Sequence, residues 1–178
     1  MPYNGYMTKE RKSRIAALNK NRDKGLAVVL EDIHDPHNAG AIFRTCDAFG
    51  IREVYLVFHM EKPWNPRKTG KAAASAGKWL TFKVFRSPGE CVKELRRRKF
   101  KVWATLLDKA AQPLGKARFN GRRIALVFGN EHRGISPELA ALADRKLYIP
   151  MKGMVQSLNL SVTAAICIYE ASRQRSRV

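Results

Sequence analysis

Short apolar runs alternate with helix-like segments along almost the whole chain, and this alternation restricts the fold more than any other feature. The runs are strand-sized and rich in Val, Ile and Leu, as in LAVVL at 26–30 and RIALVF at 123–128. Strands that are apolar on both faces are typical of a parallel sheet covered by helices on both sides. The expected strands are 26–30, 53–57, 83–85, 101–106, 123–128 and 146–149, and the expected helices are 39–49, 87–98, a short one from 136, and 157–174. The sequence therefore predicts an α/β domain with a mostly parallel sheet and helices on both faces.

The chain of 178 residues has the length of one domain that buries a core without disulfides or metal. Residues 1–24 are polar and basic and lack the apolar face of a core helix, so we expect a basic arm followed by one domain at 25–178. No apolar run is long enough to cross a bilayer, and the polar N-terminus is no secretory signal. We therefore expect a cytoplasmic protein without a membrane partner. Its three cysteines are expected to be buried free thiols.

The charge of the chain points to a polyanionic partner. There are 34 Lys and Arg residues against 15 Asp and Glu residues, which gives a net charge of +19. Such an excess is typical of proteins that bind nucleic acid. A charge count alone does not separate RNA from DNA or from an anionic membrane surface.

Three polar loops follow expected strands, at the sheet edge where ligands of parallel α/β domains collect. They are residues 38–44, 129–134 and 153–159. The loop at 129–134 has neither the G-x-G-x-x-G pattern nor a Walker ending, so no nicotinamide or ATP site is predicted. Its Glu131 could be a general base, a hydroxyl acceptor, an arginine partner, or a surface residue in a turn.

Arg44 and the region around Trp64 each leave more than one interpretation open. Arg44 could hold a phosphate with its planar guanidinium, it could form a salt bridge with Asp47, or it could lie on a solvated face of the helix. Residues 58–71 are long for a structureless connection and are suspected of being a functional loop. Trp64 within them could stack on a base or cover the core. The four histidines lack a cysteine partner at metal-site spacing, so no metal is expected.

The stretch IPMKGMVQSLNLS at 149–161 leaves the last strand and enters the last helix, with Ser157 and Asn159 at the entrance. A helix entrance presents unpaired N–H groups and a partial positive charge, which hold a carboxylate, a phosphate or an oxyanion. The alternative is an ordinary strand-to-helix connection with a serine cap.

Taken together, residues 38–50, 126–136 and 149–161 resemble the three ordered motifs of the SpoU, or TrmH-type, RNA ribose 2′-O-methyltransferases of the SPOUT class. The resemblance covers residues 26–174, and the basic arm resembles the N-terminal extension of the tRNA guanosine-18 enzymes. It implies a C-terminal trefoil knot, which is a rare exception to the rule that chains are unknotted. It also implies S-adenosyl-L-methionine bound in the knot and a homodimer with catalytic residues contributed across the interface.

The resemblance also assigns site residues by position. The implied cofactor pocket consists of Thr105, Gly129, Ile149, Ser157 and Leu158, and the implied catalytic set consists of Asn38, Arg44, Glu131, Ser157 and Asn159. In that scheme Arg44 contacts the RNA phosphate and the 2′-hydroxyl and is the base or activator of that hydroxyl. Asn38 and Glu131 orient Arg44 or the partner subunit's site. Ser157 and Asn159 fix the knot loop and the cofactor. No metal is implied.

The expected substrate is tRNA. Family members that act on ribosomal RNA often carry a separate substrate-binding domain, and only about 24 residues precede the first strand here. The segment GMVQSLN at 153–159 resembles the guanosine-18 group, which modifies the tRNA D-loop, more than the shorter wobble-position enzymes. The alternatives are 2′-O-methylation of ribosomal RNA or of another tRNA position, and a non-catalytic RNA-binding protein on the same scaffold.

Overall fold

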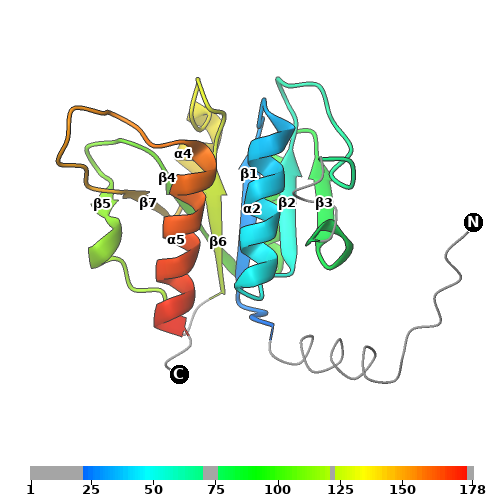
Figure 1. Cartoon of the computed structure of the whole chain (residues 1–178), viewed down its shortest axis with the longest axis horizontal. Helices are drawn as coiled ribbons and strands as arrows, with labels where there is room; N and C mark the ends of the chain where they lie inside the picture. Colours follow the sequence, from blue (N-terminus) through cyan, green and yellow to red (C-terminus); the bar gives the residue numbers. More distant parts are fainter. Residues whose placement is uncertain (1–21, 70–75, 121–122, 176–178) are drawn as a thin grey trace, which may run out of the picture.

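The computed structural model describes residues 22–69, 76–120 and 123–175, and within them a single parallel sheet runs through the molecule (Figure 1). Its seven strands follow the order β3-β2-β1-β6-β4-β7-β5, and every neighbouring pair is parallel. The strands are β1 (Leu26–Glu31), β2 (Glu53–Val57), β3 (Thr81–Phe85), β4 (Phe100–Thr105), β5 (Gln112–Pro113), β6 (Arg123–Phe128) and β7 (Arg145–Tyr148).

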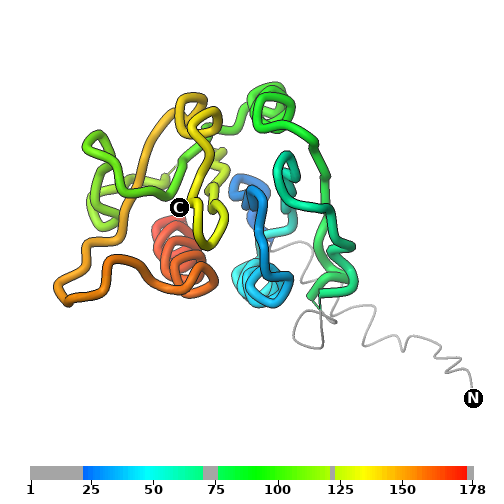
Figure 2. Tube along the Cα trace, turned by 90° about the horizontal axis from the view of Figure 1, so that it is seen from above, coloured from blue at the N-terminus to red at the C-terminus, as the bar shows by residue number. Residues whose placement is uncertain are grey.

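Helices cover both faces of this sheet (Figure 2). On one face α2 (Pro36–Ala48) packs beside α5 (Leu160–Arg175), and on the other α3 (Pro88–Arg97) packs beside α4 (Pro137–Leu142). Two short 3₁₀ turns, Ala76–Lys78 and Leu114–Lys116, complete the described elements. The predicted α/β class, with a parallel sheet and helices on both faces, is confirmed.

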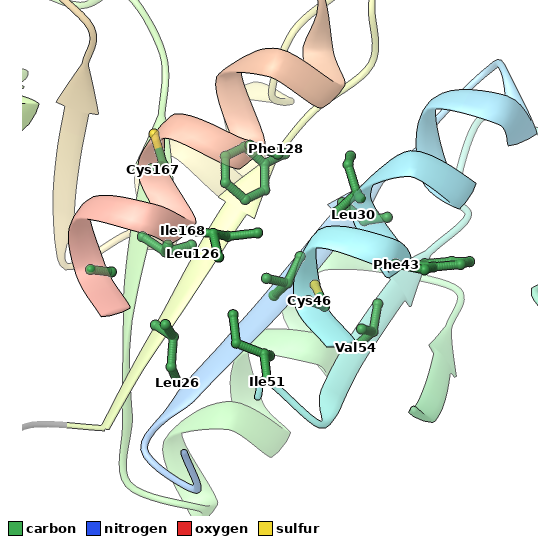
Figure 3. Packing of buried hydrophobic residues seen from close by; sticks show 14 of the residues in the cluster. Leu26, Leu30, Phe43, Cys46, Ile51, Val54, Leu126, Phe128, Cys167 and Ile168 are labelled. Atoms are coloured by element: carbon green, nitrogen blue, oxygen red, sulfur yellow. The ribbon is translucent and has the colours of Figure 1, made fainter. Parts of the chain in front are cut away.

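The two faces of the sheet carry separate hydrophobic clusters, because successive strand residues point to opposite sides. Leu30, Leu126 and Phe128 face α2 and α5, where they meet Phe43 and Ile168 (Figure 3). On the other face Val29, Val102 and Val127 pack with Leu95 of α3 and Leu139 of α4. The apolar residues at 26–30 in β1 and at 124–128 in β6 thus serve the two clusters alternately.

The cysteines are free and buried, as predicted. Burial raises the pKa of Cys91 and of Cys167 to about 12, and it raises the pKa of Cys46 further. The thiolate form of all three is therefore disfavoured. In the described parts of the chain, no helix is both long and apolar enough to cross a membrane.

Two helix starts differ from the predictions. Helix α2 begins at Pro36 and not at 39, because the Asp35 carboxylate accepts a hydrogen bond from the His37 N–H and proline fills the first helical position. Asn38 therefore lies in the first turn of the helix. Helix α5 begins at Leu160 and not at 157, because the Asn159 side chain accepts the Ser161 N–H at 2.8 Å. Ser157 is consequently in the loop and is not the cap.

Trp64 covers the core, which settles one of the open interpretations. Its indole N–H donates to the Ile33 carbonyl at 3.1 Å, and its ring lies 5.2 Å from the Phe58 ring and 6.3 Å from the Phe43 ring.

Strand β5 was not predicted from the sequence. It has only two residues and includes a proline, so it left no strand pattern in the sequence. Residues 1–21 of the predicted basic arm lie outside the described residues.

The C-terminal part of the chain crosses back over the sheet. After β6 the chain passes β4 to form β7, and then residues 149–159 return to α5 beside α2 (Figures 1 and 2). The Leu106 N–H donates to the Leu147 carbonyl at 2.9 Å, so the segment after β4 lies directly against β7. The trefoil knot that the family resemblance implies stays a prediction.

Candidate functional site

The three segments singled out as loops in the sequence meet at the carboxyl edge of the sheet, although residues 38–44 lie within α2 and not in a loop. A chain of hydrogen bonds joins one residue from each segment. The Asn159 Nδ2 amide donates to Asn38 Oδ1 at 3.2 Å. The Asn38 Nδ2 amide donates in turn to Glu131 Oε1 at 2.9 Å. Asn38 follows β1, Glu131 follows β6 and Asn159 follows β7, so the parallel sheet itself places them together.

Glu131 is held as a carboxylate by these contacts. Besides Asn38, it accepts the backbone N–H of His34 at 2.9 Å and of Asp35 at 3.2 Å. Burial alone would raise the pKa of Glu131, but the Asn38 amide and these backbone donors outweigh it and keep the pKa below its ordinary value. A carboxylate with a lowered pKa is a poor proton acceptor, so the geometry favours an anchoring role over that of a general base.

The loop that carries Glu131 is shaped by close backbone contact between two glycines. Asn130 and Gly134 exchange backbone hydrogen bonds of 2.9 Å, and Gly134 has a φ of +69°. A Cβ atom at Gly129 would lie 2.3 Å from the Gly134 carbonyl group. No side chain is therefore tolerated at Gly129 without moving the loop.

Asn130 is a site residue to which the sequence assigned no role. It is 5% exposed, and its Nδ2 amide donates to the Asp32 carbonyl at 2.7 Å. Its Oδ1 atom accepts the N–H groups of His132 and Arg133. Asn130 thus ties the Glu131 loop to the end of β1. The sequence signal that could have revealed this role was a polar residue two positions after the end of a buried strand.

Glu31 and Asp32 at the end of β1 accept hydrogen bonds that hold the neighbouring loops after β2 and β6 in place. Asp32 has a φ of +50° and accepts the N–H groups of His59, Met60 and Glu61. Glu31 accepts both the N–H and the hydroxyl of Ser136, although burial raises its pKa. Two acidic residues that end an apolar strand were the sequence signal for this support.

Arg44 lies outside the hydrogen-bonded chain and is exposed on α2. The salt bridge to Asp47 that the sequence left open is not formed, because Asp47 accepts Arg22 at 2.8 Å instead. Within the described parts of the chain Arg44 has no ion-pair partner. Its guanidinium is therefore available to a ligand.

A pocket lies beside these loops, between the ends of β4 and β7 and the entrance to α5. Its walls are mainly apolar and include Leu147, Ile149 and Leu158, while Thr105, Gln156 and Ser157 add polar groups. The Thr105 hydroxyl donates to the Val127 carbonyl at 2.8 Å. Four of the five residues expected in a cofactor pocket line this space. Gly129, the fifth, is not among its lining residues and lies against Gly134.

Comparison with known proteins gives relatives over nearly the whole chain. The tRNA (guanosine(18)-2′-O)-methyltransferase of Thermus thermophilus is 40% identical over 169 residues, which are 94% of this chain and 84% of that protein. The crystal structure of an A. aeolicus TrmH/SpoU tRNA modifying enzyme has a TM-score of 0.80 at 34% identity, and the match covers 93% of this chain and 84% of that one.

A further solved structure carries a ligand. It is the AdoMet-bound rRNA methyltransferase from Sinorhizobium meliloti, with a TM-score of 0.77 at 26% identity over 88% of this chain and 59% of that one. The SpoU rRNA Methylase family matches this chain over residues 25–169, which contain the three site segments and the pocket. This chain therefore belongs to the SpoU methylase family of RNA 2′-O-methyltransferases.

Proposed function

We propose that this chain transfers a methyl group from S-adenosyl-L-methionine to the ribose 2′-hydroxyl of guanosine 18 in the tRNA D-loop. The observation that carries the proposal is the chain of hydrogen bonds Asn159–Asn38–Glu131, which joins all three family motifs beside the pocket. The relative that is 40% identical carries this activity in its name. The charge of +19 suits an RNA substrate.

The pocket suits S-adenosyl-L-methionine by the chemistry of its walls. Leu147, Ile149 and Leu158 offer the apolar surfaces that an adenine ring needs, and Ser157 offers a hydroxyl group to its polar parts. The Thr105 hydroxyl donates to the Val127 carbonyl and therefore offers the cofactor only an acceptor. When bound, the cofactor supplies an electrophilic methyl group on a sulfonium. We propose that Gly129 contacts the cofactor through its backbone, although it is not among the residues that line the pocket.

Arg44 is proposed to meet the RNA. Its guanidinium has no ion-pair partner among the described residues, and its planar fork suits a phosphate and an adjacent hydroxyl. A guanidinium stays protonated in proteins, so Arg44 acts by holding the phosphate and polarising the 2′-hydroxyl. The reaction requires the hydroxyl oxygen in line with the methyl group, and placing it is the chief contribution of the protein. The hydroxyl proton, made more acidic by the Arg44 charge, passes to water as the oxygen–carbon bond forms and the carbon–sulfur bond breaks.

Asn38, Glu131, Ser157 and Asn159 are proposed to keep the reacting groups in register. Glu131 fixes the amide of Asn38, and Asn38 in turn fixes Asn159 at the entrance to α5. Ser157 and Leu158, which line the pocket, directly precede Asn159 in the chain, so the contacts of Asn159 also position the loop that borders the cofactor.

The proposed assembly is a homodimer through the outer face of α5. Val162, Ile166 and Tyr169 are 46%, 37% and 54% exposed, and their spacing places them on one face of the helix. Met154 and Val155 in the loop before α5 are also exposed apolar residues, at 99% and 61%. An apolar surface of this kind marks an interaction site. Arg44 is exposed on the neighbouring helix α2, from which it would reach a partner's pocket.

The test is methyl transfer from labelled S-adenosyl-L-methionine to unmodified tRNA and, separately, to ribosomal RNA. The expected product is 2′-O-methylguanosine in the D-loop, located by mass spectrometry of nuclease fragments. The matched control is the same tRNA with a 2′-deoxyguanosine at that position, which keeps the base and removes only the acceptor.

Three results would contradict parts of the proposal. Methylation of ribosomal RNA alone would replace the substrate and keep the reaction. Transfer to the 2′-deoxy control would exclude the ribose hydroxyl as acceptor. No transfer to either RNA, together with no binding of S-adenosyl-L-methionine in calorimetry, would favour a non-catalytic RNA-binding protein.

A further inference from the structure

The edge of the sheet opposite the candidate site carries a row of basic residues. Lys24 precedes β1, Arg52 precedes β2, and Lys99 precedes β4, each within two positions of the first strand residue. Because the strands are parallel, their starts share one edge, which is the lower edge in Figure 1. All three side chains are exposed.

The carboxylates at this edge are already neutralised by other cations. Asp23 accepts Arg175 Nη2 at 3.0 Å, and Glu53 accepts Arg98 Nη2 at 2.6 Å. Asp144 accepts the Val102 N–H at 2.8 Å and lies 3.5 Å from Lys101. No described residue forms an ion pair with Lys24, Arg52 or Lys99. Their three positive charges therefore face solvent without compensation.

A hollow lies between the starts of β1 and β2. Its volume is about 240 Å³, and Lys24 and Arg52 line it together with Arg22, Asp23, Glu53 and Thr81. Arg22 and the two carboxylates are satisfied by contacts within the protein, so Lys24 and Arg52 determine what the hollow attracts. Two uncompensated cations beside a hollow are suited to a phosphate group.

We propose that Lys24, Arg52 and Lys99 form a second contact for the RNA backbone, on the opposite edge from the methyl-transfer site. The proposal rests on RNA being the substrate, as argued above. Strand order places β2 and β4 three steps apart, so the row spans ~14 Å and reaches more than one phosphate. The long cationic side chains carry charge and no rings, which favours phosphate contact over base recognition.

The separation of the two edges determines which RNA uses this contact. A strand of six residues such as β1 is ~20 Å long, so an RNA that reaches both edges extends at least that far. A full-length tRNA is longer than this distance. A minimal D-loop hairpin bound at the catalytic edge is the substrate expected to use the basic row least.

The test is the salt dependence of tRNA binding, measured by filter retention without S-adenosyl-L-methionine. The variants Lys24→Ala, Arg52→Ala and Lys99→Ala are each expected to lower the slope of log K against log salt by about 1, because each removes one phosphate contact. The matched control is Lys93→Ala, which removes one exposed charge from the face of α3 and is expected to leave the slope unchanged. Unchanged S-adenosyl-L-methionine affinity in all four variants shows that the fold is intact.

A second measurement compares full-length tRNA with the D-loop hairpin. The three edge variants are expected to weaken binding of the full tRNA and to leave the hairpin unaffected. Equal slopes in the edge variants and the control, or equal weakening for both RNAs, would overturn the proposal. Because binding is measured without methyl transfer, changed slopes in a protein that transfers no methyl group would support the basic row and refute the proposed enzyme function.

Discussion

The side-chain amide of Asn38 donates to the Oε1 atom of Glu131 at 2.9 Å, although 93 residues separate the two in the sequence. This contact links the first turn of α2 to the loop after β6. It also leaves the side-chain oxygen Oδ1 of Asn38 free to accept a hydrogen bond from the Asn159 side-chain amide at 3.2 Å. The amide of Asn38 therefore has a fixed orientation, and that orientation depends on the Oε1 atom of Glu131 being an acceptor.

Glu131→Gln is expected to disrupt this arrangement while preserving the shape of the side chain. One of the two oxygens becomes an NH₂ donor that faces either Asn38 or the His34 N–H, and an unsatisfied donor costs about 1–3 kcal/mol. We expect the rate of methyl transfer to fall on the order of 100-fold. The control is Glu90→Gln, an exposed glutamate of α3, which is expected to match the wild type. Unchanged transfer by Glu131→Gln would contradict the anchoring role.

The same carboxylate predicts a pH dependence of stability. The pKa of Glu131 is held below its ordinary value of 4.5 in the folded protein. A depressed folded pKa contributes stability that is fully present above the unfolded pKa and is lost as pH falls through the folded pKa. The difference in unfolding free energy between wild type and Glu131→Gln is therefore expected to be constant above about pH 5 and to shrink below it. Urea denaturation at several pH values measures this; a difference that grows in acid would refute it.

Arg44 variants are expected to separate chemistry from folding. Arg44 is exposed and has no ion-pair partner among the described residues, so Arg44→Ala should change the unfolding free energy by less than about 0.5 kcal/mol. Methyl transfer should fall at least about 100-fold, because the phosphate and hydroxyl contact is lost. Arg44→Lys should recover only part, since lysine keeps the charge without the planar fork. Full activity of Arg44→Ala would remove this residue from the mechanism.

Gly129→Ala is expected to destabilise the protein through a backbone clash. The added Cβ would lie 2.3 Å from the Gly134 carbonyl group and 2.4 Å from the Ile135 nitrogen, and backbone atoms cannot rotate away. The cost is expected to be about 1–3 kcal/mol, with methyl transfer reduced because Glu131 moves with the loop. Gly115→Ala is the control, since its Cβ would meet nothing within 4 Å. Thermal unfolding of the two variants gives the comparison.

The sequence predicted the elements whose apolar pattern is long enough to be distinctive. Strands β1, β2 and β6 were placed within one residue of their observed ends, because each is a run of buried residues bounded by polar ones. The two residues of β5 were missed, since a pair that includes proline has no periodicity. The start of α2 was misplaced because Asp35 and Pro36 were assigned to the preceding loop, although an acidic cap before proline is a helix signal.

The site was predictable where a motif is local and unpredictable where a contact is distant. The positions of Asn38, Glu131 and Asn159 came from short motifs. The role of Asn130 did not, because it depends on a hydrogen bond to Asp32, 98 residues away. A salt bridge between Arg44 and Asp47 was compatible with helical spacing, yet Asp47 forms its ion pair with Arg22, which lies outside the helix. Local spacing shows which partners are possible, and tertiary packing selects among them.

Val162→Asp is expected to separate the proposed dimer into monomers. Val162 is 46% exposed at the start of α5, where an aspartate also suits the helix dipole, so the fold should be retained. A charge in an apolar interface is costly to bury, and the dimer should be lost in light scattering. Val84→Asp is the matched control, because Val84 is 52% exposed on β3, away from α5. Loss of methyl transfer together with the dimer would agree with a shared site, and a dimer that persists would exclude this face.

Lys99→Gly is expected to stabilise the protein and at the same time to weaken its grip on RNA. Lys99 has a φ of +63° directly after α3, a position that glycine prefers and that costs a side-chain-bearing residue about 1–2 kcal/mol. Glycine also adds entropy to the unfolded chain, so the net gain is expected to be about 0.5–1 kcal/mol, or a rise in Tm of about 2–4 °C.

Lys99→Ala keeps the Cβ atom, so it should remove the same charge without the gain in stability. Both variants should show the smaller salt slope for tRNA, because that effect depends on the charge alone. The pair therefore distinguishes a backbone effect from a charge effect at one position. Equal Tm values for the two variants would show that the left-handed backbone at Lys99 is not strained, and a salt slope that differs between them would show that the side chain acts on RNA through more than its charge.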